Sequence, residues 1–551
     1  MKKSAIVLVL IILVYSIVSF YNLGSGKSPK SFKTFDRKEI SVLRLDNMTN
    51  IKKIRFYIGY NINHYKVYLM EEENSKQAFY LNCEFDYSCV FTWKDIEVNS
   101  DSKYQYIGIY SEYENNSIGE VVAYDDNDNV IGIDVVDDKD EALVDEQDTV
   151  PDEISFMNSV YFDEVYHART AYEHLNDIEP FECVHPPLGK IIISIPVAIF
   201  GSSPLAFRFM GNIAGILMII VAYFIGKELF KKEWYGVISA SIMALDGMHF
   251  VQTRIATVDS FLVLFCMTSF LFMIKYIGIE KKGSLKKKLI YLLFSGLFIG
   301  MGIATKWTAL FVGLGLAIIF FVHFIYNIVK NKSFNKDDWK VIGACVIFFI
   351  VIPICIYLAS YIPLFNNKGC RVKDLNSLVK YTKDMYEYHS KLEAEHPFTS
   401  SWYTWPVLYK PMWYYVNYPA TDMVSDIVCL GNPFIWWFGA IATVISLLYT
   451  IVKRNKATAL LLVMIASTWL PYVFIGRIMF IYHYFITLPF VMLSIVWALK
   501  WIEKKLGSKI VSIAVLILFL VGFIYYYPIY SGKTVSKVYI EDSKIMNSWV
   551  Y

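Results

Sequence analysis

The sequence predicts a polytopic α-helical membrane protein with about 11 transmembrane helices and a β-sandwich-like insertion after the first helix. Hydrophobic residues make up 56% of the 551 residues and aromatic residues 17%, and the 19% of charged residues cluster between long apolar runs. Residues 28–150 differ from the rest, because they are rich in charge and Asn and their apolar residues alternate. The net charge of +2 argues against nucleic acid as a partner.

Residues 1–22 are expected to form the first transmembrane helix. An apolar run over 5–20 follows Lys2 and Lys3. No small-residue cleavage site is obvious near Ser19–Ser25, so we expect an uncleaved helix, with a cleaved signal peptide as the alternative. In either case the following segment lies outside the cytoplasm.

The remaining predicted helices are separated by loops of two kinds. Spans are expected over 204–226, 235–252, 257–278, 289–304, 308–329, 341–361, 433–452, 457–475, 478–499 and 509–527, so that helices 2–7 occupy 204–361 and helices 8–11 occupy 433–527. Alternate loops carry Lys clusters, and the short loops between them hold one basic residue each, namely Arg254, Lys306 and Arg477. The positive-inside rule places the Lys clusters in the cytoplasm, and the isolated cations and the tail 528–551 outside.

The predicted cytoplasmic loops are short and contain no P-loop and no GxGxxG fingerprint. If the protein transfers a group, a cytosolic nucleotide is therefore not expected to be the donor.

The segment 28–150 is expected to be a small extracytoplasmic β-rich domain. Alternation over 54–58, 67–69, 106–109 and 121–124 indicates short strands, and Asp125–Asn129 is typical of a hairpin turn. The acidic run 137–152 is interpreted as a solvated linker. A sugar- or acceptor-binding role and a structural cap both remain open for this domain.

Cysteine spacing predicts no metal site. Cys83 and Cys89 are close enough in sequence for a disulfide in the outer domain, unless a reducing source keeps them as thiols. No Cys-x-x-Cys pair or zinc-type spacing occurs.

The outer loop 362–432 combines a helical stripe with an aromatic motif. Apolar residues at 375, 378, 379, 385, 386 and 392 predict an amphipathic helix on the outer membrane surface. The motif Ser400–Trp413 contains Trp402 and Trp405. These rings are interpreted either as interfacial belt residues or as groups that stack on sugar rings or hold a polyprenyl chain.

The outer segment 151–203 concentrates ionisable residues where the chain enters the membrane. Such groups are costly there, so a functional site is expected. Asp163 and Glu164 are adjacent and point about 100° apart on a helix, which favours different roles. One could accept the proton of an acceptor hydroxyl while the other orients the acceptor. The alternative is a helix N-cap or an exposed acidic pair.

Outer-face cations would suit the second requirement of a transfer from a lipid-linked phosphate, which is to hold and stabilise the departing phosphate. Alternatively, each is an interfacial or helix-end charge. Lys306 and Arg477 have no nearby acid in the sequence, and His185 precedes Pro186-Pro187. The candidates are His185, Lys190, Arg208, Arg254, Lys306, Arg477 and His483.

An ordered set of motifs resembles the protein O-mannosyltransferase family, the dolichyl-phosphate-mannose-dependent enzymes, in a bacterial form. The matching pieces run from Phe162-Asp-Glu-Val-Tyr-His-Ala-Arg169 to Arg477-Ile-Met-Phe-Ile-Tyr-His-Tyr484. Between them lie Val184-His-Pro-Pro-Leu-Gly-Lys190, Arg208, Gln252–Ser260, Gly300–Trp307, Ser401–Pro406 and Gly431–Trp437.

The resemblance implies a GT-C fold and an inverting, single-displacement transfer of mannose or a related hexose from a polyprenyl-phosphate carrier to Ser/Thr hydroxyls of exported proteins. It implies Asp163 as the catalytic carboxylate, Glu164 as an acceptor-side partner and Arg208 facing the carrier phosphate. Tyr166, Trp402 and Trp405 are expected acceptor or sugar contacts. No cofactor is expected, and the active site is expected on the extracytoplasmic face of the plasma membrane.

Two departures from the family pattern leave alternatives open. Residues 28–150 stand where eukaryotic members have a short link, and the loop 362–432 is too short for their large sugar-binding-like domain. A glycolipid or cell-wall polymer acceptor is therefore an alternative to protein, and a transporter or flippase is a remote one. Oligomeric state is not predicted.

Overall fold

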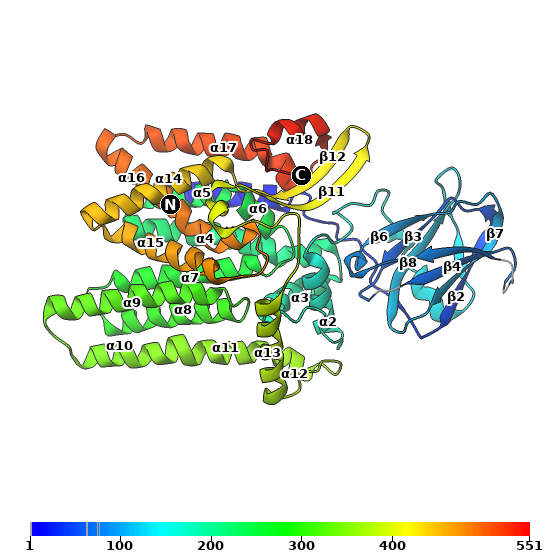
Figure 1. Ribbon diagram of the computed structural model, residues 1–551, viewed down its shortest axis with the longest axis horizontal. Coiled ribbons are helices and arrows are strands. Elements are labelled where there is room, and N and C mark those ends of the chain that lie inside the picture. The colour runs from blue at the N-terminus through cyan, green and yellow to red at the C-terminus, as the bar shows by residue number, and fades with distance from the viewer. Residues whose placement is uncertain (1–2, 62–63, 74, 76–77, 281) are drawn as a thin grey trace. The chain divides into compact units, whose positions relative to one another are not determined.

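The computed structural model describes the chain except residues 1–2, 62–63, 74, 76–77 and 281, and it consists of two compact units (Figure 1). The helical unit comprises Met1–Tyr21, Asp177–Ile192 and Met210–Tyr551. The β unit comprises Asn22–Asn176 and Ile193–Phe209.

The β unit contains two antiparallel sheets (Figure 1). One has the order β1-β8-β3-β6 with β9 paired to β8, and the other has the order β10-β2-β7-β4-β5. The strands are β1 (Lys33–Phe35), β2 (Glu39–Asn50), β3 (Lys53–Ile58), β4 (Tyr65–Met70), β5 (Ala78–Cys83), β6 (Trp93–Glu97), β7 (Lys103–Ser111), β8 (Asn116–Tyr124), β9 (Val130–Ile131) and β10 (Ile133–Val135).

Alternating apolar residues form the core of the sandwich. Phe56 on β3 and Val67 on β4 are at most 1% exposed, and the rings of Phe35 and Tyr65 meet at 5.5 Å between the sheets. The predicted strands and the β-rich insertion are confirmed. The turn Asp125–Asn129 is confirmed as well, because β9 pairs antiparallel with β8 immediately after it.

The acidic run 137–152 is not the solvated linker that the sequence suggested. It forms the 3₁₀ turns η2 (Asp138–Leu143) and η3 (Gln147–Thr149). Asp140 is 1% exposed and lies 2.9 Å from the Lys33 ammonium. Charge density alone could not reveal this, because the partner is about a hundred residues away in the sequence.

Most of the helices lie in the helical unit, and α3 and α4 are shared with the β unit. The helices are α1 (Lys3–Phe20), α3 (Leu188–Phe200), α4 (Pro204–Phe230), α5 (Glu233–Ala244), α6 (Gly247–Thr253), α7 (Asp259–Ile277), α8 (Leu285–Ile303), α9 (Ala309–Asn331), α10 (Lys336–Val346), α11 (Ile352–Ser360), α12 (Ile362–Asn366), α13 (Leu375–Lys391), α14 (Pro433–Lys453), α15 (Lys456–Trp469), α16 (Leu488–Leu506), α17 (Ile510–Ser531) and α18 (Lys537–Ser543). The helix α2 (Glu164–Leu175) belongs to the β unit.

Among the described residues, eight helical segments are long and apolar enough to span a membrane. They are Lys3–Phe20, Pro204–Phe230, Asp259–Ile277, Ala309–Asn331, Lys336–Asn366, Pro433–Lys453, Lys456–Phe474 and Ile510–Ser531. The polytopic α-helical class is thereby confirmed, whereas the count of 11 stays a prediction.

Three predicted spans fall outside this group for local reasons. The span 235–252 is divided into α5 and α6, because the Asp246 carboxylate accepts the His249 backbone N–H at 2.9 Å and starts a new helix. The span 289–304 corresponds to α8, which begins in a Lys-rich stretch. The span 478–499 begins as a 3₁₀ turn, and α16 starts only at Leu488.

The predicted amphipathic helix exists as α13, but its apolar residues face two directions. Leu378 and Met385 pack in a cluster with Tyr361 and Leu364, whereas Leu375 remains 64% exposed. Attachment of the exposed side to a membrane surface stays a prediction.

The cysteines are thiols in this structure. Cys83 and Cys89 are both free and buried, and no disulfide joins them. Burial raises the pKa of the Cys83 thiol to about 12, which disfavours the reactive thiolate.

Candidate active site

Asp163 occupies the position immediately before α2 in the β unit. The preceding residue, Phe162, has φ of 51°, a left-handed conformation that is uncommon outside glycine. Asp163 is half-buried, and its carboxylate makes no capping hydrogen bond to α2. The capping interpretation therefore does not account for this side chain.

Glu164 and Arg208 form a buried bidentate ion pair within the β unit. Arg208 Nε donates to Glu164 Oε1 and Nη2 donates to Oε2, each at 2.7 Å. Both side chains are 0% exposed. Glu164 is thus not an exposed acid, and it also accepts the Tyr161 backbone N–H at 3.1 Å.

The other Arg208 donors bind backbone carbonyls. Nη1 donates to Leu23 O at 2.9 Å and to Phe156 O at 2.7 Å, and Nη2 donates to Ser159 O at 3.0 Å. A guanidinium has five N–H donors, and these contacts occupy all of them. Arg208 consequently has no donor left for a carrier phosphate in this conformation, contrary to the expectation from the family resemblance.

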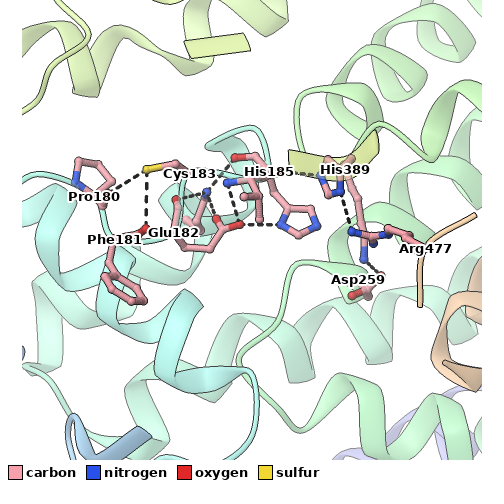
Figure 2. Close-up of polar contacts among 11 residues, drawn as sticks. Pro180, Phe181, Glu182, Cys183, His185, Asp259, His389 and Arg477 are labelled. Atoms are coloured by element: carbon pink, nitrogen blue, oxygen red, sulfur yellow. Dashed lines mark hydrogen bonds and ion pairs between the residues drawn. The ribbon is translucent and has the colours of Figure 1, made fainter. Parts of the chain in front are cut away.

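In the helical unit, the loop before α3 is organised by Glu182 (Figure 2). Its Oε1 lies 2.7 Å from His185 Nδ1, and its Oε2 binds the Lys190 ammonium. Lys190 also donates to Glu182 O at 3.0 Å and to His185 O at 2.8 Å. These bonds use the three donors of the ammonium, so Lys190 stabilises the loop rather than presenting its charge to a ligand.

His185 lines a cavity of about 450 Å³ that contains several basic side chains. Lys306, Arg477, His389 and His483 line it as well, and no Asp or Glu belongs to its described lining. Burial lowers the pKa of His185 despite the attraction of the Glu182 carboxylate. The walls are completed by apolar residues that include Leu310 and Phe474.

Two contacts orient the strongest cations of this pocket. Lys306 Nζ lies 2.8 Å from Asp259 Oδ1, so the absence of a nearby acid in the sequence was misleading. Arg477 Nη1 donates to His389 Nδ1 at 2.8 Å, and His389 Nε2 donates to Val184 O at 2.6 Å (Figure 2). This network requires the neutral Nε2–H tautomer of His389. Burial, followed by the nearby His185 and Arg477, lowers the pKa of His389 to about 4.

The aromatic motif supports this pocket from behind. Trp405 is fully buried, stacks on His483 with centroids 6.0 Å apart, and donates Nε1–H to Ser400 Oγ at 3.0 Å. The Trp402 carbonyl accepts Trp469 Nε1–H at 2.9 Å. Neither indole lines the cavity, so the structure gives no direct support for their expected contact with sugar.

The remaining predicted residues lie elsewhere. Arg254 donates to Ser19 O at 3.1 Å and to Tyr21 O at 2.9 Å, which satisfies carbonyls at the end of α1. Tyr166, on α2 of the β unit, lies beside Tyr87 with ring centroids 5.7 Å apart.

Sequence reasoning missed three residues that shape the pocket. Asp259 was visible within the Gln252–Ser260 motif, but only folding reveals its pairing with Lys306. His389 was hidden on the polar side of an amphipathic helix, and Glu182 stood just before the His-Pro-Pro motif. Within the part of the chain that the structure describes, no group of three or more His, Cys, Asp or Glu is arranged to hold a metal ion.

The fold is that of a membrane glycosyltransferase of the GT-C class. A solved yeast structure, the S. cerevisiae protein O-mannosyltransferase Pmt1-Pmt2 complex bound to the sugar donor, matches with a TM-score of 0.63 at 15% identity, covering 71% of this chain and 89% of that chain. At this identity the match shows the fold.

The family follows from sequence models. The model for dolichyl-phosphate-mannose-protein mannosyltransferase matches residues 199–367, and that for the C-terminal four-helix region of protein-O-mannosyltransferase matches 375–549. The chain belongs to the protein O-mannosyltransferase family.

Two curated bacterial relatives are similar over most of their length. The polyprenol-phosphate-mannose–protein mannosyltransferase of Mycolicibacterium smegmatis is 25% identical over 455 residues, covering 70% of this chain and 87% of the relative. The protein of the same description from Mycobacterium tuberculosis is 24% identical over 446 residues, covering 68% of this chain and 84% of the relative.

Proposed function

We propose that the protein transfers mannose, or a related hexose, from a polyprenyl-phosphate carrier to Ser/Thr hydroxyls of exported proteins. The names of the mycobacterial relatives give polyprenol-phosphate-mannose as the donor and protein as the acceptor. The observation that carries the proposal is the pocket in which Lys306 and Arg477 stand among three imidazoles without a lining carboxylate. Such a pocket suits a phosphate group.

The proposed step is a single displacement at the anomeric carbon. The acceptor oxygen forms a bond to C1 of the sugar as the bond from C1 to the phosphate oxygen breaks, and the electron pair of that bond leaves with the carrier phosphate. The hydroxyl proton passes to Asp163. Attack from the face opposite the leaving phosphate inverts the anomeric configuration. No cofactor takes part.

Asp163 is assigned as the base because it is the carboxylate of the Asp-Glu motif immediately before α2, whereas Glu164 is held in the ion pair with Arg208. An ionised carboxylate can accept the hydroxyl proton as the new bond forms, and general-base assistance of this kind contributes roughly 10²- to 10⁴-fold. The left-handed Phe162 turns the chain just before this residue, and strained residues of this type cluster at functional sites.

Lys306 and Arg477 are assigned to the carrier phosphate. Lys306 is held by Asp259, and Arg477 is held by the neutral His389, so both cations are oriented before a ligand arrives. Pre-positioned donors stabilise the charge that develops on a leaving phosphate without reorganisation during the reaction. His185 supplies an imidazole at the same cavity.

The apolar side of the pocket suits the carrier's hydrocarbon chain. Leu310 and Phe474 line the cavity and are 54% and 90% exposed. A polyprenyl phosphate combines an anionic head with an apolar tail, and this cavity offers both environments to it.

Arg208 and Lys190 are proposed as positioning residues, because their donors are engaged by protein groups. Arg208 fixes Glu164 and the segments around Phe156 and Ser159. Lys190 fixes the loop that carries His185. Glu164 is therefore proposed to align the start of α2 and not, as the family resemblance implied, to contact the acceptor directly.

We place the reaction on the extracytoplasmic face of the plasma membrane. Lys306 directly precedes α9 and Arg477 follows α15, and both stand in loops that are poor in basic residues. Lys-rich loops mark the opposite ends of these helices.

Transfer to purified acceptors tests the proposal. The full-length protein in nanodiscs is given polyprenyl-phosphate-mannose and a panel of Ser/Thr peptides, with glycolipid acceptors in parallel. Radiolabelled mannose on peptide is the expected product, and elimination under alkali identifies the O-linkage. Transfer to lipid alone would replace the acceptor assignment, and no transfer to any acceptor would contradict the proposed activity.

A further inference from the structure

A second cavity, of about 390 Å³, lies in the helical unit between a β-hairpin and the C-terminal segment. The hairpin consists of β11 (Met412–Ala420) and β12 (Met423–Cys429), and β13 (Val535–Ser536) pairs with β12. Figure 1 shows the hairpin beside α18 and the C-terminus. The volume of this cavity is within the usual range for small-ligand sites.

The walls of this hairpin pocket are joined by hydrogen bonds from separate segments. Trp413 Nε1 donates to Asp426 Oδ1 at 2.9 Å, which fixes both side chains. Lys537 N donates to Asp422 O at 3.0 Å. Trp549 Nε1 donates to Leu408 O at 2.7 Å, which ties the end of the chain to the same region. Hydrogen bonds therefore hold the hairpin and the C-terminal segment in place around the pocket.

The lining combines flat rings with hydrogen-bonding groups of both kinds. Trp413, Tyr418 and Tyr551 supply the rings, Asp426 and Glu541 supply acceptors, and the Lys537 ammonium supplies donors. Lys537 Nζ lies 5.2 Å from the centre of the Tyr418 ring. Tyr418 is 57% exposed, whereas Asp426 is only 2% exposed.

We propose that the hairpin pocket binds a neutral hexose unit, such as the mannose of an acceptor that already carries sugar. A pyranose ring has an apolar C–H face suited to an aromatic ring and a rim of hydroxyls that both donate and accept. The mixed lining matches this pattern better than it matches an anion or an apolar chain. The link to acceptors rests on the proposed mannosyl transfer; the binding itself does not.

The state of Asp426 gives the site a pH dependence. Burial raises the pKa of Asp426 to about 6, opposed by the Trp413 hydrogen bond and by Lys544. Lys537, Glu541 and Tyr551 are the other titratable groups of the lining. Ionised Asp426 accepts hydroxyl protons more strongly, so hexose affinity should decrease as the pH falls below about 6.

Binding is measured by saturation-transfer NMR on the full-length protein in nanodiscs, with methyl α-D-mannopyranoside as the probe. For a ligand this small, the expected Kd is in the millimolar range. A mannosylated Ser/Thr peptide and the same peptide without sugar form the second arm, and polyprenyl-phosphate-mannose forms the third.

Matched variants separate this pocket from the candidate active site. Tyr418→Ala and Asp426→Asn should weaken mannoside binding about 5-fold or more, from the loss of a stacking ring or of a charged acceptor. Tyr403→Ala removes a similarly exposed tyrosine (65%) outside the pocket and should leave binding unchanged. Lys306→Ala and Asp163→Asn should leave it unchanged too.

The expected result is saturable mannoside binding that depends on Tyr418, and preference for the mannosylated peptide over the plain one. If binding does not saturate at mannoside concentrations tenfold above the expected millimolar Kd, the proposal is overturned. Equal binding of both peptides, weakened equally by Tyr418→Ala, would overturn the hexose assignment in favour of a peptide site. If the wild-type protein binds the mannoside but transfers mannose to no acceptor, the proposed function is contradicted and the hexose-binding proposal stands.

Discussion

Replacing Glu164 by Gln removes the negative half of the buried ion pair while nearly preserving the side chain's size. Two hydrogen bonds of 2.7 Å join Glu164 to Arg208, and both side chains are fully buried. The variant leaves a buried guanidinium without its counter-charge, which costs about 3–5 kcal/mol. Because each 1.4 kcal/mol is a factor of ten, local opening around α2 should become about 100-fold more frequent or more.

Arg208→Met should destabilise the same region more strongly than Glu164→Gln. It removes the charge and also leaves the carbonyls of Leu23, Phe156 and Ser159 without this donor. A buried carbonyl without a partner costs about 1–3 kcal/mol. The double variant has no unpaired charge, so its cost should be about 2–3 kcal/mol less than the sum of the single costs.

Hydrogen exchange measures these differences on the full-length protein in nanodiscs, through peptides that cover Glu164–Leu175. The control is Asp95→Asn in the same unit. Arg55 binds Asp95 in a similar bidentate way, at 2.6 and 2.9 Å, but Asp95 is 28% exposed. The control should change the opening free energy by about 1 kcal/mol or less. Equal effects of Glu164→Gln and Asp95→Asn, or strictly additive costs, would show that Glu164 and Arg208 do not form a stabilising buried pair.

Three further predictions concern the phosphate pocket and the buried thiols. Lys306→Ala should lower kcat/KM for the lipid donor about 10- to 150-fold, because a charge-assisted hydrogen bond to the donor is lost. Replacing the exposed Lys286 by Ala should leave kcat/KM unchanged. Equal kcat/KM values for Lys306→Ala and the wild type would exclude Lys306 from the donor site. The pKa of His389 is lowered to about 4, so the folded protein resists protonation of this side chain. The free energy of unfolding should therefore decrease as the pH falls from about 6.5 towards 4. After allowance for solvent screening, His389→Gln should remove about 1 kcal/mol of that loss at pH 5, as measured by unfolding at a series of pH values. An unchanged acid profile would contradict the assignment of His389 as neutral in the folded protein. Cys83 and Cys89 should react with a maleimide only after denaturation and without a reductant, and a requirement for reductant would reveal a disulfide.

Periodicity and composition were sufficient for the fold class, because long apolar runs and alternating strands have few other solutions in a membrane protein. They were insufficient where a side chain interrupts an element. Asp246 divides α5 from α6 by capping a new helix, although the apolar run continues across it. The C-terminal 528–551 also looked like a plain tail, yet it forms β13 and α18 against the hairpin.

The site was only partly predictable for a related reason. The motifs identified Lys306 and Arg477, which line the pocket, because isolated cations in sparse loops are visible in sequence. Whether a cation is available depends on partners that are distant in sequence. Arg208 is neutralised by a residue 44 positions away, and Lys306 is held by a residue 47 positions away. Sequence therefore identified the charges but not which of them are already paired.

The most direct test of the central claim is the turnover of Asp163→Asn. The purified variant is compared with the wild type for transfer from polyprenyl-phosphate-mannose to a Ser/Thr peptide, with donor affinity measured separately. We expect a kcat lower by roughly 10²- to 10⁴-fold, with donor affinity unchanged and the same far-UV spectrum. Turnover within a factor of about ten of the wild type would contradict the assignment of Asp163 as the base.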